Sequence, residues 1–277
     1  VVIWSASSDS GEAQVGAQLT FTSSNWATPQ TFTITGVDDS IADGDQQATF
    51  TVGVVDASSA DAYDGVANQS VTATNADNET AGFTLSTTSV SVTEAGGTDT
   101  FTVVLDTEPA GDVVIWSLSS DSGEAQGGVP LTFTSSNWNT PQTFTITGVD
   151  DSIDDGDQQA NFTVEVKDDE SHDAYDDVAN QSVTATTTDD DTVGFTLSTT
   201  TVSVTEAGGQ DTFTVVLDTQ PASPVVIWSA SSDSGEAQVG GQLTFTSLNW
   251  ATPQTFTITG IDDSIADGDQ QATFTVG

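Results

Sequence analysis

Short runs in which apolar and polar residues alternate recur along the whole chain. In the run 89–93, Val90 and Val92 alternate with serine and threonine, and the run 142–149 has the same two-residue period. Runs of this kind, rich in Thr, Val and Phe and bounded by Gly, Pro, Asp and Ser, are typical of β-strands with one buried face. No stretch sustains a 3.6-residue period, so the pattern predicts an all-β chain with essentially no helix.

The alternating pattern itself repeats every 112 residues. The motif Val-Val-Ile-Trp begins at Val1, Val113 and Val225, and no insertion or deletion interrupts the spacing. A period of 112 residues has the size of a whole domain, not of a solenoid unit. Two acidic hinges, residues 75–80 (the first hinge) and 187–192 (the second hinge), separate the copies. We therefore predict a partial repeat lacking its first strands (1–80), a complete repeat (81–192) and a partial repeat lacking its last strand (193–277), which we call the first, middle and third repeats.

Seven strands are predicted in the middle repeat, which implies an immunoglobulin-like antiparallel β-sandwich. The predicted strands span residues 82–93, 99–106, 113–118, 131–134, 142–149, 161–166 and 178–186. Alternate strands run in opposite directions, so the loops after the first, third and fifth strands share one end with the tail after the seventh. We call this end the acidic pole, because its segments carry Glu94, Asp121, Glu124, Asp150, Asp151, Asp154, Asp155, Asp157, Asp189, Asp190 and Asp191.

Composition narrows the possible functions. The 277 residues include 42 Asp or Glu but only one Lys or Arg, and the net charge is −41. Binding to nucleic acid or to an anionic membrane requires many cations, so both are excluded. The absence of cysteine excludes disulfides and thiolate metal sites. No 18-residue apolar run predicts a membrane span. The chain opens without a signal-like segment, and we expect it to be a window of a longer protein.

The acidic pole needs positive charge that the side chains do not supply. Two carboxylates about 5 Å apart repel by roughly 3 kcal/mol at an effective dielectric near 20, and several such pairs rival the roughly 5–15 kcal/mol stability of a domain. Calcium accepts six to eight oxygen ligands, whereas magnesium demands tighter octahedral geometry and zinc favours His or Cys. Clustered Asp therefore predicts calcium. The alternative is that acidic residues only hydrate the protein in concentrated salt.

The middle repeat resembles the Calx-beta domain, and more closely its bacterial relatives that occur in tandem in giant secreted surface proteins and adhesins. The motifs that carry the resemblance are Val90–Gly97, Phe101–Leu105, Leu131–Trp138, Pro141–Asp151 and Thr188–Asp191. The resemblance covers the repeat and, through the repeats, the whole chain. It implies a calcium-binding sandwich whose ions lie at the C-terminal pole, next to the following domain.

The resemblance also implies the ligands. In the middle repeat they are Glu94, Asp150, Asp151, Ile153 through its carbonyl, Asp155, Asp157, Asp189, Asp190 and Asp191. The equivalent residues of the other repeats are Asp38, Asp39, Asp43, Asp45, Asp77, Glu79, Glu206, Asp262, Asp263, Asp267 and Asp269. Asp121 and Glu124 are not counted as ligands, because their loop departs from the family pattern. The first hinge reads Asp-Asn-Glu, so fewer ions are expected there.

We therefore predict a rod of calcium-loaded sandwiches, stiffened at its junctions, from an extracellular microbial surface protein, adhesin or fibre. Its partners are the neighbouring repeats. The alternatives are an adhesive module that binds polysaccharide or ice, and a filament subunit whose partial repeats receive strands from identical chains. Trp116 fits either the core or an interface. No nucleophile–base pair is present, so the chain is not expected to be an enzyme.

Overall fold

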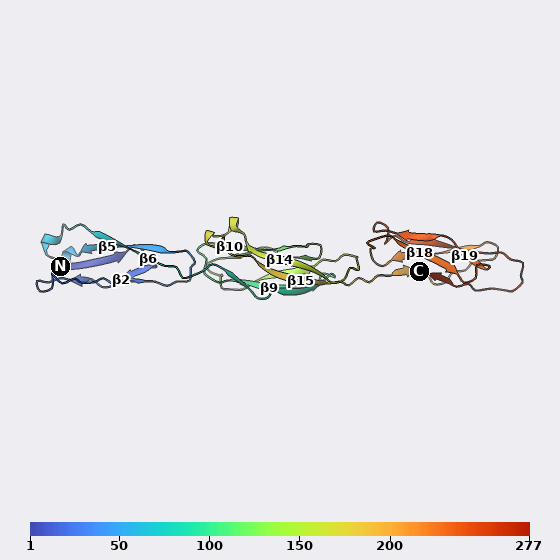
Figure 1. Ribbon diagram of the computed structural model, residues 1–277, viewed down its shortest axis with the longest axis horizontal. Coiled ribbons are helices and arrows are strands. Elements are labelled where there is room, and N and C mark those ends of the chain that lie inside the picture. Colours follow the sequence, from blue (N-terminus) through green and yellow to red (C-terminus); the bar gives the residue numbers. More distant parts are fainter.

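The computed structural model describes residues 1–277 and shows three β-sandwich units in line, which form one elongated rod (Figure 1). Strands pair within the blocks 2–75, 83–188 and 195–276, and the only β-bridge between two blocks is an isolated one that joins Ile41 and Glu108. The predicted boundaries of the repeats fall in the intervals between these blocks and stay predictions.

Helix is confined to four short 3-10 turns. These are η1 (Asp56–Ser58), η2 (Asp61–Tyr63), η3 (Asp168–Glu170) and η4 (Asp173–Tyr175). None has the length or the apolar character that a membrane-crossing helix requires. The prediction of an all-β, immunoglobulin-like chain is therefore confirmed, with the 3-10 turns as a small addition.

The middle repeat is a sandwich of two sheets. The five-stranded sheet has the order β12 (Leu131–Phe133), β10 (Val113–Ser119), β14 (Gln158–Val166), β15 (Gln181–Thr188) and β8 (Ser89–Thr93). The four-stranded sheet has the order β11 (Ala125–Gln126), β13 (Gln142–Gly148), β9 (Thr98–Leu105) and β7 (Phe83–Leu85). Nineteen buried residues fill the space between them, including the paired rings of Phe101 and Phe144, whose centroids lie 5.3 Å apart.

The first predicted strand, 82–93, is wrong in one respect, because it forms two strands in different sheets. β7 pairs antiparallel with β9, while β8 crosses to the other sheet and pairs in parallel with β15. Buried side chains explain the split: Phe83 faces the core from one sheet, and Val90 and Val92 face it from the other. The short strand β11 was not predicted, because two residues show no alternation.

The first and third repeats contain fewer strands than the middle one. The first repeat has β1 (Val2–Ser7), β2 (Ala13–Val15), β3 (Leu19–Thr20), β4 (Ile34–Gly36), β5 (Gln46–Val54) and β6 (Gln69–Asn75). The third has β16 (Phe195–Leu197), β17 (Gln210–Leu217), β18 (Val225–Ser231), β19 (Ala237–Val239), β20 (Gln242–Phe245), β21 (Gln254–Gly260) and β22 (Phe274–Val276). Their core clusters hold three and eight buried residues.

Trp116 lies outside the core cluster. Val113 and Ile115 of β10 are fully buried between the sheets, so Trp116, on the opposite face of the same strand, points outward. The Lys167 ammonium lies 5.5 Å from the centroid of its ring, a cation–π contact. The equivalent Trp228 is 44% exposed. Of the two alternatives that the sequence left open for Trp116, core or interface, the structure does not support the core, and the interface stays a prediction.

The end of β8 packs closely on β13. A Cβ added at Gly148 would lie 2.1 Å from the carbonyl oxygen of Thr93. We expect Gly148→Ala to destabilise the middle repeat by about 1–3 kcal/mol or more, because the backbone of one strand must move. Urea unfolding checks this value. Gly240→Ala is the control, since a Cβ there meets nothing within 4 Å, and equal effects of the two substitutions would contradict the packing argument.

Candidate metal centre

Glu94 is placed by the end of β8. Its backbone N–H donates to the carbonyl of Thr188 at the end of β15 (3.1 Å), so the parallel pairing of the two strands fixes its position. The turn that follows closes through Gly96, whose φ of 77° suits glycine. The Glu94 side chain is only 1% exposed, and its Oε2 is buried without a hydrogen-bond partner. A buried, unpartnered carboxylate oxygen is costly unless a cation or a proton is bound to it.

The second hinge brings two more carboxylates to Glu94. Ligand oxygens of Glu94, Asp189 and Asp191 all lie within 4.8 Å of one another. The Asp191 N–H donates to Asp189 Oδ1 (2.8 Å), and the Gly156 N–H donates to Asp189 Oδ2 (2.7 Å). The hinge therefore wraps onto the loop between β13 and β14, which we call the E–F loop (residues 149–157).

The E–F loop faces the same cluster. Asp151 Oδ1 accepts from the Ile153 N–H (2.7 Å), and Asp157 Oδ1 accepts from the Asp189 N–H (3.2 Å). Burial raises the pKa of Glu94 to about 7, and the charges of neighbouring carboxylates add to this, first Asp189 and then Asp151. Desolvation and nearby carboxylates, those of Asp189, Asp190, Asp151 and Asp150 in that order, also raise the pKa of Asp191.

Glu124 also belongs to this cluster, although the sequence interpretation set it aside. Its Oε2 is buried without a hydrogen-bond partner, and burial followed by the charges of Asp155 and Asp121 raises its pKa. The carbonyl of Glu124 accepts from the Val149 N–H and from Thr187 Oγ1, which ties it to the E–F loop and to β15. Recurrence at 112-residue spacing, as Glu12, Glu124 and Glu236, is the signal that could have identified it.

The family model of the Calx-beta domain matches residues 76–192 and 188–277, which together cover well over half of the chain. The chain belongs to the Calx-beta domain family. Calx-beta domains are calcium-binding domains.

Several solved structures are similar to the chain. CBD12 from CALX1.2 is 15% identical, covers 71% of this chain and 79% of its own, and has a TM-score of 0.31. The calcium binding domain CBD12 of CALX1.1 is 16% identical, with coverage of 70% and 79% and a TM-score of 0.31. Domains 4–9 of the surface layer protein SbsC are 14% identical, with coverage of 99% and 36% and a TM-score of 0.33. Curated proteins include no match.

The residues of the acidic pole fit a calcium ion. Every candidate ligand is an oxygen, and Glu94 and Glu124 each have one buried carboxylate oxygen without a hydrogen-bond partner. No side-chain cation neutralises them, because the only lysine, Lys167, pairs with Glu170. Calcium prefers sites in which every ligand atom is an oxygen and several of the ligands are carboxylates. Individual ligands stay predictions.

The other two repeats hold only part of this arrangement. In the third, ligand oxygens of Glu236, Asp263 and Asp267 lie within 4.8 Å of one another, whereas Glu206 is exposed. The segment 201–205 before Glu206 forms no strand, since no counterpart of β15 pairs with it. Asp262 and Asp269 are not part of that group.

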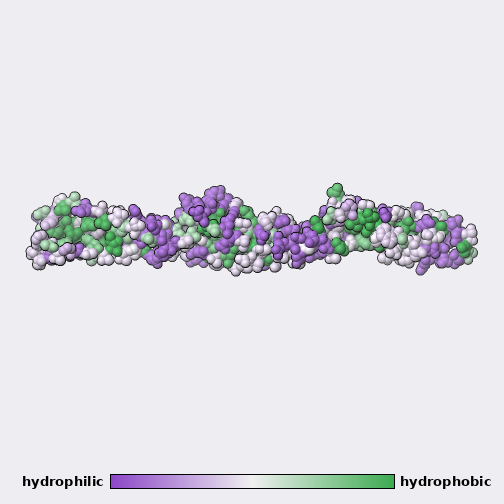
Figure 2. Space-filling model, viewed as in Figure 1, coloured by the Kyte–Doolittle hydropathy of each residue, from purple (hydrophilic) through white to green (hydrophobic).

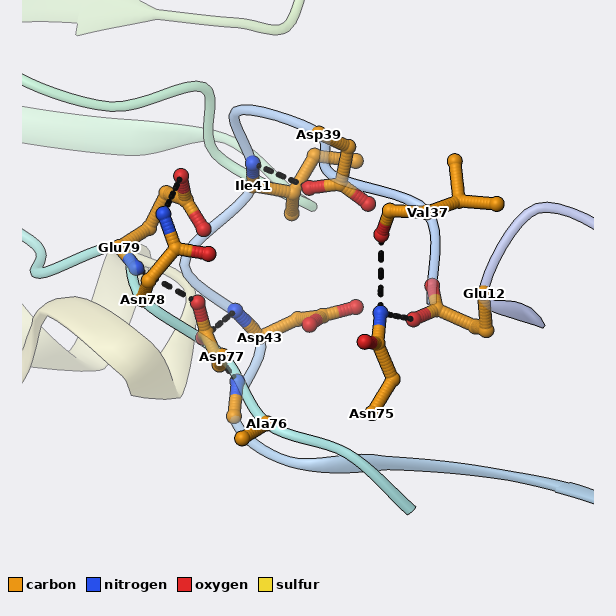
Figure 3. A pocket seen from close by; sticks show the side chains of 11 residues that line it. Glu12, Val37, Asp39, Ile41, Asp43, Asn75, Ala76, Asp77, Asn78 and Glu79 are labelled. Carbon is orange, nitrogen blue, oxygen red and sulfur yellow. Dashed lines mark hydrogen bonds between the residues drawn. The ribbon is translucent and has the colours of Figure 1, made fainter. Parts of the chain in front are cut away.

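In the first repeat the hinge wraps as the second hinge does. Asp77 Oδ2 accepts from the N–H groups of Gly44 (2.6 Å) and Asp43 (3.1 Å), and the Asp77 N–H donates to Asp45 Oδ1 (3.1 Å). The backbone N–H groups of Glu79, Gly44 and Asp43 donate to the Asp77 carboxylate and lower its pKa, and the effect of Glu79 is the largest. Figure 3 shows a small cavity lined by this hinge and by three carboxylates from the body of the repeat, those of Glu12, Asp39 and Asp43. Asp38 does not line it.

The raised pKa of Glu94 predicts a pH dependence in the absence of calcium. Between its unfolded value of 4.5 and about 7, folded Glu94 holds a proton that the unfolded chain has released, so stability falls as pH rises through this window. When calcium is removed with a chelator, the melting temperature should fall less between pH 5 and pH 8 in the Glu94→Gln variant than in the parent chain. Asp169→Asn, an exposed residue outside the acidic pole, is the control, and it should keep the full fall.

Proposed function

We propose that this chain is a calcium-binding structural spacer of an extracellular microbial surface protein, adhesin or fibre, in which occupied acidic poles stiffen the junctions between repeats. The observation that supports this most directly is the convergence of a buried body residue, Glu94, with two hinge residues, Asp189 and Asp191. A ligand shared by these three side chains must hold the hinge against the sandwich.

The junctions are built so that the E–F loop touches the next repeat. The Gln220 N–H donates to the carbonyl of Ser152 (2.7 Å), and the Glu108 N–H makes the equivalent bond to Ser40 (2.8 Å). At the second junction the Val193 N–H also donates to Asp154 Oδ2 (2.7 Å). Ordering the E–F loop therefore restricts the following repeat as well.

Charge gives this arrangement its dependence on a cation. Figure 2 shows strongly hydrophilic residues gathered at both junctions. A bound calcium ion supplies two positive charges and up to eight positions for oxygen ligands. Without such a charge the carboxylates of Glu94, Asp189 and Asp191 repel one another, and the hinge moves outward into water, where the repulsion is screened.

An extracellular setting suits this chemistry. Extracellular calcium modules bind at roughly 10⁻⁴–10⁻³ M, so external fluids saturate them. The chain contains no cysteine that could staple the repeats. We further propose that it is not an enzyme, since its clustered acids lie at the junctions and hold the hinge.

Calcium is expected to stabilise the chain far more than sodium does. At a concentration about 100-fold above its dissociation constant, calcium should add about 2.7 kcal/mol per site, or roughly 10 °C in the melting temperature of a repeat of this size. Differential scanning calorimetry in calcium chloride and in sodium chloride of equal ionic strength measures the difference. Equal melting temperatures in the two salts would refute the proposal.

Variants test whether the acidic pole is responsible for the stabilisation. Glu94→Gln removes a ligand charge from the acidic pole of the middle repeat and should weaken calcium binding there, measured by isothermal titration calorimetry. Asp169→Asn removes the same charge from η3 and should leave the affinity unchanged. If both variants lose the same affinity, only the total charge matters and the proposed site is wrong.

The stiffness of the junctions can be measured separately from the stability of the repeats. Small-angle X-ray scattering should show a longer maximum dimension and a narrower range of bend angles with calcium than with a chelator. Asp154→Ala removes the carboxylate that accepts from the Val193 N–H and should widen the range of bend angles at the second junction. The first junction carries Ala42 at the equivalent position and serves as the internal reference. A rod equally rigid in both buffers would show that the ions are not needed for stiffness.

A further inference from the structure

The first hinge contains an acceptor pattern for N-glycosylation. Residues 78–80 read Asn-Glu-Thr, and the pattern Asn-x-Ser/Thr, with x other than proline, accepts a glycan on its asparagine side chain. The pattern occurs at four places, which begin at Asn68, Asn78, Asn161 and Asn180. Because the pattern is short, only the structure around each copy separates an acceptor from a coincidence.

Three of the four copies are built into a sheet. Residues 161–163 lie inside β14, and the side chain of Phe162 at their centre is fully buried. The two residues after Asn180 pair with β14, and the two residues after Asn68 pair with β5. A transferase therefore reaches these three copies in the folded chain only if a sheet opens.

The copy in the first hinge lies outside every strand. β6 ends at Asn75 and β7 begins at Phe83, so the copy lies in the irregular segment between them. The backbone N–H groups of Asn78 and Thr80 make no hydrogen bond. No ladder or turn has to break before this segment enters an enzyme, which is the situation typical of modified loops.

The two sides of the first hinge carry different chemistry. Asn78 and Thr80 are exposed, and they alternate with Asp77 and Glu79, which are half-buried. The acceptor amide and the threonine hydroxyl therefore share the outer side of the hinge. Asn78 lies at the edge of the cavity in Figure 3, where its amide donates to the Glu79 carboxylate (3.1 Å). An N-linked sugar replaces only one of the two amide hydrogens, so the other can keep this bond.

The second hinge shows that the outer side stays open next to a complete repeat. It follows the middle repeat, and its residues Asp190 and Thr192 are exposed while Asp189 and Asp191 are half-buried. The first hinge precedes the same complete repeat and shows the same alternation. The second hinge carries Asp190 where the first carries Asn78, so it has the geometry without the acceptor.

We propose that Asn78 is an N-glycosylation site whose glycan projects from the outer side of the first hinge. The co-substrate is a sugar activated as a glycosyl diphosphate. A bond forms between Asn78 Nδ2 and the anomeric carbon, the bond from that carbon to the diphosphate oxygen breaks, and the diphosphate leaves with the electron pair. The amide nitrogen loses one proton to a base of the transferase. The proposal rests on the extracellular location in the proposed function and not on calcium binding.

Peptide mapping by mass spectrometry tests the proposal on the full chain, recovered from outside the cells that make it. An N-glycosidase converts each glycosylated asparagine to aspartate, and the change in mass marks the site. We expect conversion of Asn78 in most molecules and of Asn161 in almost none. An exported chain with unmodified Asn78 overturns this proposal and leaves the calcium spacer intact. A chain found only inside the cells contradicts the extracellular setting, and this proposal falls with it.

Two substitutions of Thr80 form a matched pair. Thr80→Val removes the hydroxyl that the acceptor pattern requires, with little change in side-chain size, and should abolish the conversion of Asn78. Thr80→Ser keeps the hydroxyl and should preserve the conversion. If both variants lose the modification, or both keep it, the modification does not follow the acceptor pattern and the proposal fails.

The second hinge offers a test by gain of the modification. Asp190→Asn completes the acceptor pattern with Asp191 and Thr192 in the same exposed geometry. The variant should acquire a glycan there, detected as an intact glycopeptide that the parent chain lacks. A second hinge that stays unmodified while Asn78 is converted would show that the exposed side of a hinge does not select the site, and would overturn the structural argument.

Discussion

Repulsion between carboxylates that have no cationic side chain beside them is the constraint on which the rod depends. The chain has one lysine, and it lies in an ion pair away from the acidic poles. Backbone N–H groups offset part of the charge, as Gly156 and Asp191 do for Asp189. They leave the buried oxygens of Glu94 and Glu124 without partners. Folding alone therefore does not complete the acidic pole, and its state depends on what the solvent supplies.

The alternation of Thr and Val allows the chain to form an apolar core although it carries so many acidic residues. Because one face of each strand is apolar and the other polar, the core is formed without any charged residue except Glu94. Acidic residues are thereby displaced to loops and hinges, where water or a ligand can reach most of them. The repulsion between carboxylates is therefore concentrated at the ends of the sandwich, where neighbouring repeats meet.

The sequence was a good guide to strands and a weaker guide to their pairing. Alternation located β9, β10, β13 and β14 to within a few residues, because each has one face in the core. It did not show that 82–93 divides between sheets, since alternation reports which face is buried and not which partner a strand has. The sequence placed Glu124 at the acidic pole but did not show that one of its carboxylate oxygens is buried. The bonds that its backbone carbonyl accepts from β15 and from the E–F loop appear only in the tertiary fold.

One strand connects the core and the candidate metal centre. β15 pairs with β8 and so positions Glu94, continues into the hinge that carries Asp189, and follows the turn that places Tyr175 in the core. The third repeat has nearly the same sequence up to this strand, yet its Glu206 is exposed and its segment 201–205 is unpaired. Identical motifs therefore differ in structure according to whether a strand of this type is present. Pairing of such a strand with the segment 201–205 would bring Glu206 toward the position that Glu94 occupies in the middle repeat.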